Sequence, residues 1–271
     1  MATARSCVVL LSHRLCDTTL ARHEELAATL PPDASLVLAL TEPLGRAASR
    51  LGLGDVEILP HAEVFLPAYA AKVASGKPAS HNTDLALLAV WRQRPRHAFY
   101  WLVEYDVWLP RGGALIADLD AATEADYLVP FAPAARTPDS RWNHWSWFRH
   151  PPEVAPLLEA DPPRHSMQCI ERLSAALLAA LDTAYRAGWS GHPEALLPTI
   201  ARLNGLSVET MRALGRRLLG KEIVTKRSFR ARDAGPEPGA EIYHPVKTEV
   251  VREALAEAAA VALRGAPTVR G

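Results

Sequence analysis

Short apolar runs separated by helix-like stretches fill the first 109 residues and constrain the fold more than any other feature. Between the runs, residues 17–30 start with cap-type residues (Asp17 or Thr18), residues 80–95 start in the same way, and both space their apolar residues as a helix does. Strands that alternate with helices predict an α/β fold with a largely parallel sheet, whose ligands bind beyond the carboxyl ends of the strands. The runs with β-type composition are residues 6–13, 34–41, 55–60 and 97–109.

The rest of the chain predicts further helices around a long loop. A short helix and a strand at 126–131 come first, and residues 132–156 form a loop rich in Pro, Trp and Arg. No internal repeat or sharp linker divides the chain, so we expect one domain. The later elements are an amphipathic helix at 166–188, a helix at 192–206 that is interrupted at Pro198, a flexible segment at 216–247 and a final helix at 248–265.

Composition excludes several classes of function. The 271 residues include 30 basic and 30 acidic side chains, so the formal net charge is zero and gives no support for nucleic-acid binding. Cys7, Cys16 and Cys169 are odd in number and lack metal-type spacing, which argues against a disulfide framework or a zinc site. No run is long enough for a signal segment or a membrane span, so we expect a cytoplasmic protein.

Two carboxylates interrupt the most apolar run. Glu104 and Asp106 lie within YWLVEYDVWL, at 100–109, and a buried unpaired carboxylate costs several kcal/mol. Side chains at positions i and i+2 of a strand point the same way, so the two acids can converge on one hard cation such as Mg²⁺ or Mn²⁺. The alternative is that one acid caps a turn and the other pairs with an arginine.

Three segments together resemble GT-A-fold glycosyltransferases. WLVEYDV at 101–107 is similar to their acidic metal motif, and in particular to a poorly characterised group with this motif. GHPEALLPTIARLNGL at 191–206 resembles an acceptor-side segment of inverting enzymes, and IYHPVK at 242–247 resembles the late metal or diphosphate segment. The resemblance implies one GT-A-like domain with helices flanking the sheet. Residues 1–131 would be its nucleotide-sugar half and residues 132–271 its acceptor half with the C-terminal helix.

The resemblance also assigns roles in sugar transfer. Glu104, Asp106 and His244 would hold a divalent cation, Mn²⁺ or Mg²⁺, that bridges the donor diphosphate. Glu194 would be the general base that deprotonates the acceptor hydroxyl, which implies inversion. Each role has a plainer alternative: Glu194 as a first-turn glutamate after Pro193, and His244 as a surface histidine. Lys226, Arg227 and Lys247 would neutralise the leaving diphosphate, or belong to a solvated basic loop.

Further candidates surround the expected nucleotide and acceptor. Ser12, His13 and Arg14 follow the first strand, where the fold would hold the nucleotide. Asn82 and Asp84 would contact it too, or simply cap a helix. Tryptophan faces suit sugar rings, although the same spacing can plug the core beneath a loop. The acceptor-side candidates are Trp142, His144, Trp145, Trp147 and His192, with Asn143 as a further polar contact.

Other enzyme classes lack their motifs. The chain contains no G-x-G-x-x-G, no P-loop and no G-x-S-x-G elbow. The leading hypothesis is a metal-assisted glycosyltransferase that uses a nucleotide-diphosphate sugar and a carbohydrate, glycolipid or small-molecule acceptor. The alternatives are a metal-dependent nucleotidyltransferase or phosphohydrolase, and a non-catalytic carbohydrate-binding protein.

Overall fold

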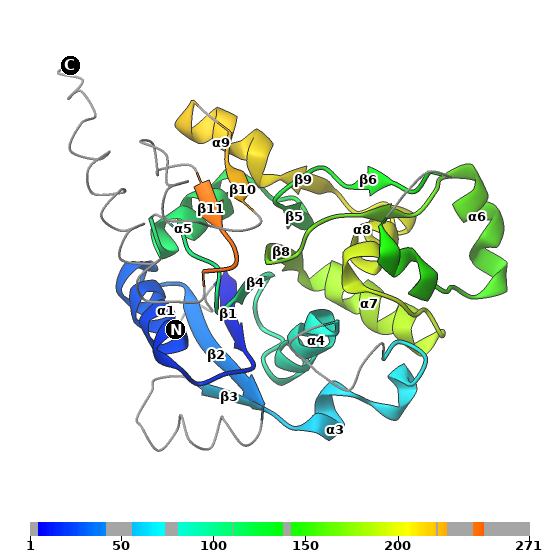
Figure 1. Ribbon diagram of the computed structural model, residues 1–271, viewed down its shortest axis with the longest axis horizontal. Helices are drawn as coiled ribbons and strands as arrows, with labels where there is room; N and C mark the ends of the chain where they lie inside the picture. Colours follow the sequence, from blue (N-terminus) through cyan, green and yellow to red (C-terminus); the bar gives the residue numbers. More distant parts are fainter. Residues whose placement is uncertain are drawn as a thin grey trace. The chain divides into compact units, whose positions relative to one another are not determined.

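The structure is a computed structural model, and it confirms a mixed α/β fold with a central, mostly parallel sheet flanked by helices (Figure 1). Contacts along the chain group it into two compact units. Unit 1 comprises residues 1–15, 32–104 and 124–210, and unit 2 comprises residues 16–31, 105–123 and 211–271. The residues whose structure is described are 5–41, 56–73, 81–109, 111–137, 142–220, 222–226 and 241–246.

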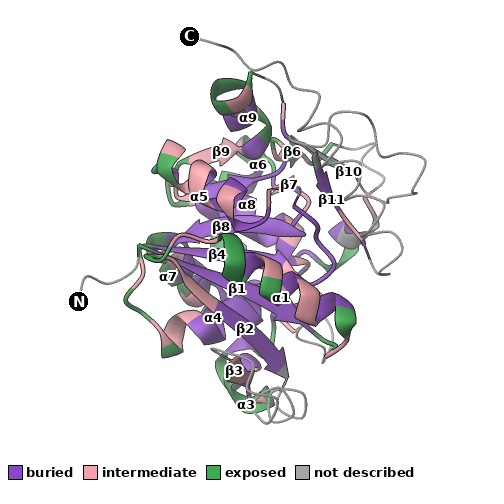
Figure 2. Ribbon diagram, turned by 90° about the vertical axis from the view of Figure 1, so that its left-hand side faces the viewer, coloured by how far each residue is buried: buried purple, intermediate pink, exposed green. Residues whose placement is uncertain are grey.

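Unit 1 contains a seven-stranded sheet in the order β3-β2-β1-β4-β8-β5-β9. Strand β8 is antiparallel to β4 and to β5, and the other neighbours run parallel. Every residue of β1 is buried, which is why it reads as one continuous apolar run (Figure 2). The strands are β1 (Ser6–Ser12), β2 (Ser35–Thr41), β3 (Val56–Leu59), β4 (Phe99–Glu104), β5 (Tyr127–Val129), β8 (Ile170–Ser174) and β9 (Val208–Thr210).

Helices of unit 1 pack on this sheet and on one another. Helix α4 contacts β1, β3 and β4, and it also packs on α7, which in turn packs on α8. The helices are α3 (His61–Val64), α4 (Thr83–Gln93), α6 (Ala155–Ala160), α7 (Ala175–Arg186) and α8 (Pro193–Leu203). The 3-10 turns are η1 (Pro67–Tyr69), η2 (Asn143–Trp147) and η3 (Pro152–Val154). The short strands β6 (Ala134–Ala135) and β7 (Arg164–His165) pair antiparallel in a separate two-stranded sheet.

The helix predicted at 166–188 is wrong in its first part, which forms β8. The apolar spacing of α7 extends backwards into this strand, and Glu171 and Arg172 therefore resemble the solvent face of a helix. In the structure both are buried: the Arg172 guanidinium lies 4.0 Å from the Phe99 ring centroid and donates to the Ala125 carbonyl at 2.9 Å. Helix α7 begins only after Ser174, whose hydroxyl accepts from the Leu177 amide.

Two other boundaries differ from the prediction. Strand β4 ends at Glu104, so Asp106 lies in the turn that follows and not in the strand. Helix α8 runs through Pro198 without interruption. A proline has no N–H for the carbonyl four residues earlier, and the structure supplies a substitute, because the Ser166 amide donates to the Glu194 carbonyl at 2.9 Å.

Unit 2 holds α1 (Asp17–Thr29), α5 (Gly113–Ala122) and α9 (Met211–Leu219), with β10 (Val224–Lys226) paired in parallel to β11 (Glu241–Tyr243). Helix α1 is confirmed, but its N-cap is Cys16, not Asp17 or Thr18. The start of α5 lies against the end of α1, where the Gly113 amide donates to the Thr29 hydroxyl at 2.7 Å. A Cβ at Gly113 would come within 2.5 Å of Leu30, so this close approach requires glycine.

Within the segment predicted as flexible, 216–247, the described residues include the end of α9 and the strands β10 and β11. The final helix predicted at 248–265 lies outside the described residues. Across the described part of the chain, none of the helices combines the length and the apolar character that crossing a membrane requires. The functional division at residue 131 stays a prediction.

Candidate active site

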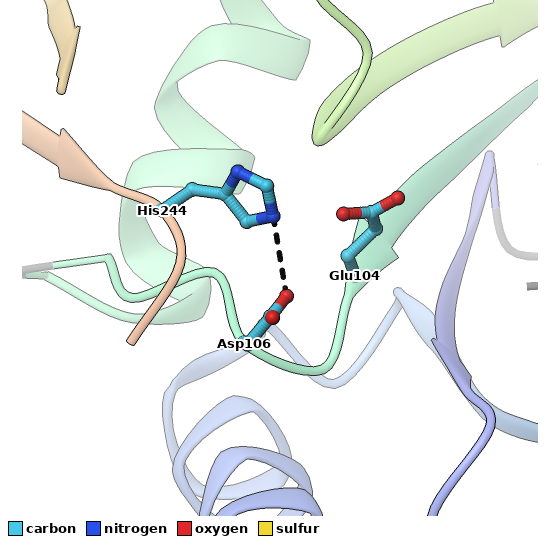
Figure 3. A group of neighbouring side chains, drawn as sticks. All are labelled: Glu104, Asp106 and His244. Carbon is cyan, nitrogen blue, oxygen red and sulfur yellow. Dashed lines mark ion pairs between the residues drawn. The ribbon is translucent and has the colours of Figure 1, made fainter. Parts of the chain in front are cut away.

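Asp106 and His244 meet in unit 2 although 137 residues separate them in the sequence. Asp106 is 3% exposed, and its Oδ1 lies 3.2 Å from Nε2 of His244, which follows β11 (Figure 3). Backbone hydrogen bonds hold the two segments together: Trp108 and Tyr243 exchange N–H···O bonds of 2.9 and 3.0 Å, and the Val246 amide donates to the Asp106 carbonyl at 2.7 Å. The imidazole is therefore placed by a backbone ladder.

Glu104 completes the group from the end of β4. One potential ligand atom from each of Glu104, Asp106 and His244 lies within 4.8 Å of the other two (Figure 3). The two acids converge because the chain turns after Glu104, so the predicted strand alternation is not the cause. Among the described residues this is the only group of three or more histidine, cysteine or acidic side chains with metal-like spacing.

The donor set fits a hard divalent cation. Carboxylate oxygens suit Mg²⁺ and Mn²⁺, and a neutral imidazole nitrogen is a general ligand of metal ions in proteins. Two carboxylates at this spacing repel each other unless a positive charge lies between them, and His244 carries a charge only when it is protonated. These residues can therefore hold a divalent cation.

Aromatic and imidazole rings gather in unit 1 as a ring cluster, which consists of His81, Trp142, Trp145, Trp147, His165 and His192. Trp142 stacks on His165 with centroids 4.9 Å apart, and its edge meets His192 at 5.7 Å. Trp147 lies 5.0 Å from His81 and 6.4 Å from His192. The sequence reasoning named Trp142, Trp145, Trp147 and His192 but missed His81 and His165, because residues so distant in the chain share no local pattern.

The tryptophans of the ring cluster divide between two roles. Trp145 is 5% exposed and packs edge-on against Phe148, so it belongs to the core. Trp147 is 39% exposed. For Asn143 and His144 only the backbone, in η2, is described. Trp145 is therefore a core residue, as the alternative interpretation predicted, and Trp147 remains the candidate surface for a sugar ring.

Glu194 occupies the first turn of α8, directly after Pro193. The N-cap is His192, whose Nδ1 accepts from the Glu194 amide at 3.3 Å and lies 4.0 Å from the Glu194 carboxylate. The Glu194 side chain is 23% exposed. Its carboxylate is therefore both a first-turn anion, which the helix N-terminus stabilises, and accessible from solvent.

A buried carboxyl that the sequence reasoning missed lies on β8. Glu171 is 1% exposed and accepts a 2.7 Å hydrogen bond from the Tyr127 hydroxyl. Burial raises its pKa well above the ordinary value; the Tyr127 bond opposes this, and the Asp84, Glu104 and Glu194 carboxylates add to it. Had residues 170–174 been predicted as a buried strand, Glu171 would have been a candidate for the same reason as Glu104, because an acid within a buried strand is costly.

The residues expected to contact the nucleotide differ in their burial and in their hydrogen-bond partners. Ser12, at the end of β1, is buried, and its hydroxyl donates to the Arg14 carbonyl at 2.6 Å and accepts from the Arg14 amide. The side chain of His13, the residue between these two in the sequence, is exposed. Asn82 and Asp84 are almost completely buried, and Lys72 donates to Asn82 at 3.3 Å and pairs with Asp84 at 3.2 Å. For Lys226 only the backbone, in β10, is described, and Arg227 and Lys247 lie outside the described residues.

Comparison with known proteins finds partial likenesses among solved structures. No protein-family model matches the chain, and no curated protein sequence is significantly similar to it. Mouse xyloside xylosyltransferase 1 is 13% identical over 89% of this chain and 96% of its own, with a TM-score of 0.47. Glucosyl-3-phosphoglycerate synthase from Mycobacterium tuberculosis, solved with Mg²⁺ and uridine diphosphate, is 14% identical over 76% of this chain and 68% of its own, with a TM-score of 0.43. The inositol-1-phosphate CTP transferase from T. maritima is 9% identical over 77% of this chain and 85% of its own, with a TM-score of 0.42.

Proposed function

We propose that the protein is a glycosyltransferase that moves a sugar from a nucleotide-diphosphate donor to an acceptor hydroxyl. The observation that carries the proposal is the meeting of Glu104, Asp106 and His244 at the end of β4. Ligands of parallel sheets bind beyond the carboxyl ends of the strands, and β4 ends at this group. The position of the acids at this edge of the sheet supports the proposal that they act on a nucleotide ligand.

Glu104, Asp106 and His244 would hold Mn²⁺ or Mg²⁺ together with the donor diphosphate. A bound divalent cation supplies charge neutralisation for a diphosphate leaving group. The side chains fix where the diphosphate lies, and Ser12, His13 and Arg14, at the carboxyl end of β1, are the proposed contacts for the rest of the nucleotide. Lys226, Arg227 and Lys247 are the proposed additional phosphate contacts.

Glu194 is the proposed general base. Its carboxylate would accept the proton of the acceptor hydroxyl as that oxygen forms the new bond to the anomeric carbon and the bond to the diphosphate breaks. Direct attack of this kind inverts the anomeric centre. Glu194 is partly solvent-accessible in the first turn of α8, so an acceptor can reach its side chain.

The exposed ring of Trp147 and the neighbouring His192 form the proposed acceptor surface. A tryptophan face suits the apolar face of a sugar ring, and imidazole nitrogens can hydrogen bond to hydroxyl groups. His192 precedes Glu194 by two residues, so an acceptor on this surface lies beside the base. Trp142 supports His192 from within the ring cluster.

The test is the thermal stability of the protein with UDP, GDP, CDP, ADP and dTDP, each with and without Mn²⁺. A ligand at about 100 times its Kd raises the free energy of unfolding by about 2.7 kcal/mol. We expect one diphosphate to stabilise the wild type in a Mn²⁺-dependent way, and we expect Asp106→Asn to lose that dependence. The matched control is Asp118→Asn, because Asp118 lies on α5 of the same unit and pairs with Arg111 on the surface.

Outcomes separate the parts of the proposal. If no diphosphate stabilises the wild type, the transferase assignment is wrong. If Mn²⁺-dependent stabilisation persists in Asp106→Asn, the metal group is assigned to the wrong residues. Stabilisation without Mn²⁺ dependence would move the phosphate contacts to Lys226, Arg227 and Lys247.

The same three ligands also suit attack at phosphorus by a nucleotidyltransferase or phosphohydrolase, and isotope labelling separates the two reactions. Hydrolysis of the bound nucleotide sugar in ¹⁸O-water should place the label on the sugar if the anomeric carbon is attacked. Label in the phosphate would instead support the phosphorus chemistry. The non-catalytic alternative predicts sugar binding at Trp147 with no turnover.

A further inference from the structure

The first turn of α8 is held from outside the helix. The Gln168 side-chain amide donates to the Pro193 carbonyl at 2.9 Å, and the Ser166 amide donates to the Glu194 carbonyl at 2.9 Å. The second bond replaces the helix bond that Pro198 cannot make. The turn that carries Glu194 therefore depends on the segment 166–168 as well as on its own helix.

Gln168 is in turn held by the sheet. The same amide nitrogen donates to the Tyr127 hydroxyl at 3.0 Å, and that hydroxyl donates to Glu171 at 2.7 Å. The three side chains are 5%, 0% and 1% exposed in the order Gln168, Tyr127, Glu171. Strands β5 and β8 are thus linked through side chains to the start of α8, and all of these residues belong to unit 1.

This chain of hydrogen bonds is costly to maintain. Among the described residues, Gln168 Oε1 and Glu171 Oε1 are buried without a hydrogen-bond partner. An unsatisfied buried polar atom costs on the order of 1–3 kcal/mol, and an apolar packing of the same shape would avoid the cost. The hydrogen bonds that are made fix the positions of Gln168, Tyr127 and Glu171 relative to one another.

We propose that Gln168, Tyr127 and Glu171 are positioning residues for Glu194: they fix the first turn of α8 and so the place of its carboxylate. The inference rests on the proposed role of Glu194 as the base. A general base must lie within about 2.6–3.2 Å of the hydroxyl whose proton it takes, and an error of about 1 Å can cost about 100-fold in rate. The three residues act through Glu194 and make no contact with substrate in this scheme.

Tyr127→Phe is the sharpest variant, because it removes the central hydroxyl and keeps the ring. Tyr100→Phe is its matched control. Tyr100 is also fully buried, its hydroxyl donates to the Arg94 carbonyl at 2.5 Å, and Tyr100 and Tyr127 both pair with Leu173 across the sheet. The hydroxyl also accepts from the His97 amide at 3.4 Å, so the control loses a phenolic hydroxyl with two hydrogen bonds on the same sheet without touching α8.

Hydrogen exchange tests the structural step without any ligand. The amides of Glu194, Ala195 and Leu196 bond to His192, and we expect them to exchange at least about tenfold faster in Tyr127→Phe than in Tyr100→Phe. The amides of β1 serve as the internal reference. Equal exchange at α8 in the two variants would overturn the proposal.

Turnover tests whether positioning matters to the base. With the nucleotide sugar whose diphosphate stabilises the wild type as probe, we expect Tyr127→Phe to lower kcat for donor hydrolysis up to about 100-fold, with an unchanged donor KM. The same substitution made in Glu194→Gln should have no further effect, because the group it positions is already disabled. Additive losses would show that Tyr127 acts through something other than Glu194.

Failure of this inference differs from failure of the proposed function. If no diphosphate binds the wild type, the transferase assignment falls, whatever the exchange rates are. If diphosphate binding and turnover are present but Tyr127→Phe behaves as Tyr100→Phe does, the positioning role alone is wrong.

Discussion

Asp84 and Asp106 are both almost fully buried, at 1% and 3% exposure, yet their partners differ. Asp84 pairs with the Lys72 ammonium at 3.2 Å and accepts a 2.5 Å hydrogen bond from the Tyr185 hydroxyl. Asp106 has the His244 imidazole at 3.2 Å and the Glu104 carboxylate in the same group. Two carboxylates with nearly the same burial therefore have partners of different kinds, an ammonium and a hydroxyl for Asp84 and an imidazole for Asp106.

The Asp84 group is a closed arrangement. Lys72 also donates to Asn82, and burial lowers the pKa of Lys72 while the Asp84 carboxylate beside it raises that pKa. The group joins α4 and α7 inside the core. The Asp106 group, in contrast, brings two acids close to an imidazole. We expect substitutions to weaken the first group's contribution to folding and the second group's contribution to binding.

The largest effect should come from Lys72→Met. This variant leaves the Asp84 carboxylate buried without its cation, and breaking a buried pair in this way costs about 3–5 kcal/mol. Urea denaturation should show that loss in the free energy of unfolding. Adding Asp84→Asn should recover part of it, and a single variant as stable as the wild type would contradict the comparison.

Tyr185→Phe should be the next largest. It removes the hydroxyl that donates to Asp84, and a hydrogen bond to a charged buried group is worth about 1.5–3 kcal/mol. The ring stays in place, so no cavity forms. Urea denaturation with an unchanged slope should report the loss, while nucleotide binding should remain as in the wild type.

Glu171→Gln should change stability in a pH-dependent way. Burial raises the pKa of Glu171 above its unfolded value of 4.5, so the folded protein holds a proton there that the unfolded chain releases. The stability from this protonation is present in full below the unfolded pKa and is lost as the pH rises through the folded pKa. The amide of the Glu171→Gln variant does not ionise, so the variant does not lose stability in this way as the pH rises.

Urea midpoints at about pH 5 and about pH 8 test this sign. The stability of Glu171→Gln relative to the wild type should increase between the two pH values. A relative stability that stays constant or falls would show that Glu171 is already ionised in the folded protein.

Asp106→Asn should have the smallest effect on folding. The substitution removes a negative charge beside Glu104, which offsets the lost pairing with His244, so we expect a change within about 1 kcal/mol when no metal is present. Urea denaturation in a chelating buffer is the measurement. A loss as large as that of Lys72→Met would place Asp106 with Asp84 as a structural acid.

Local sequence patterns predicted much of the fold. Strands β1, β2, β3 and β4 and helices α1 and α4 were predicted because buried parallel strands read as apolar runs and helices carry caps and leucine spacing. Strand β8 was missed because the helical spacing of α7 continues into it, and only its pairing with β4 and β5 buries Glu171 and Arg172. A tertiary partner overrode the local pattern.

The sequence by itself determined that two acids come at the end of an apolar strand. It also determined that they need partners, because burying Glu104 and Asp106 there without a compensating partner is costly. It also determined that Glu194 opens a helix, because Pro193 favours that position. The tertiary structure alone decided how the segment of His244 is held against that of Asp106, that Trp147 is exposed while Trp145 is buried, and that α8 continues through Pro198. Each of these depends on residues far apart in the chain, such as Trp108 with Tyr243 and Ser166 with Glu194, and contacts of that range leave no local periodicity.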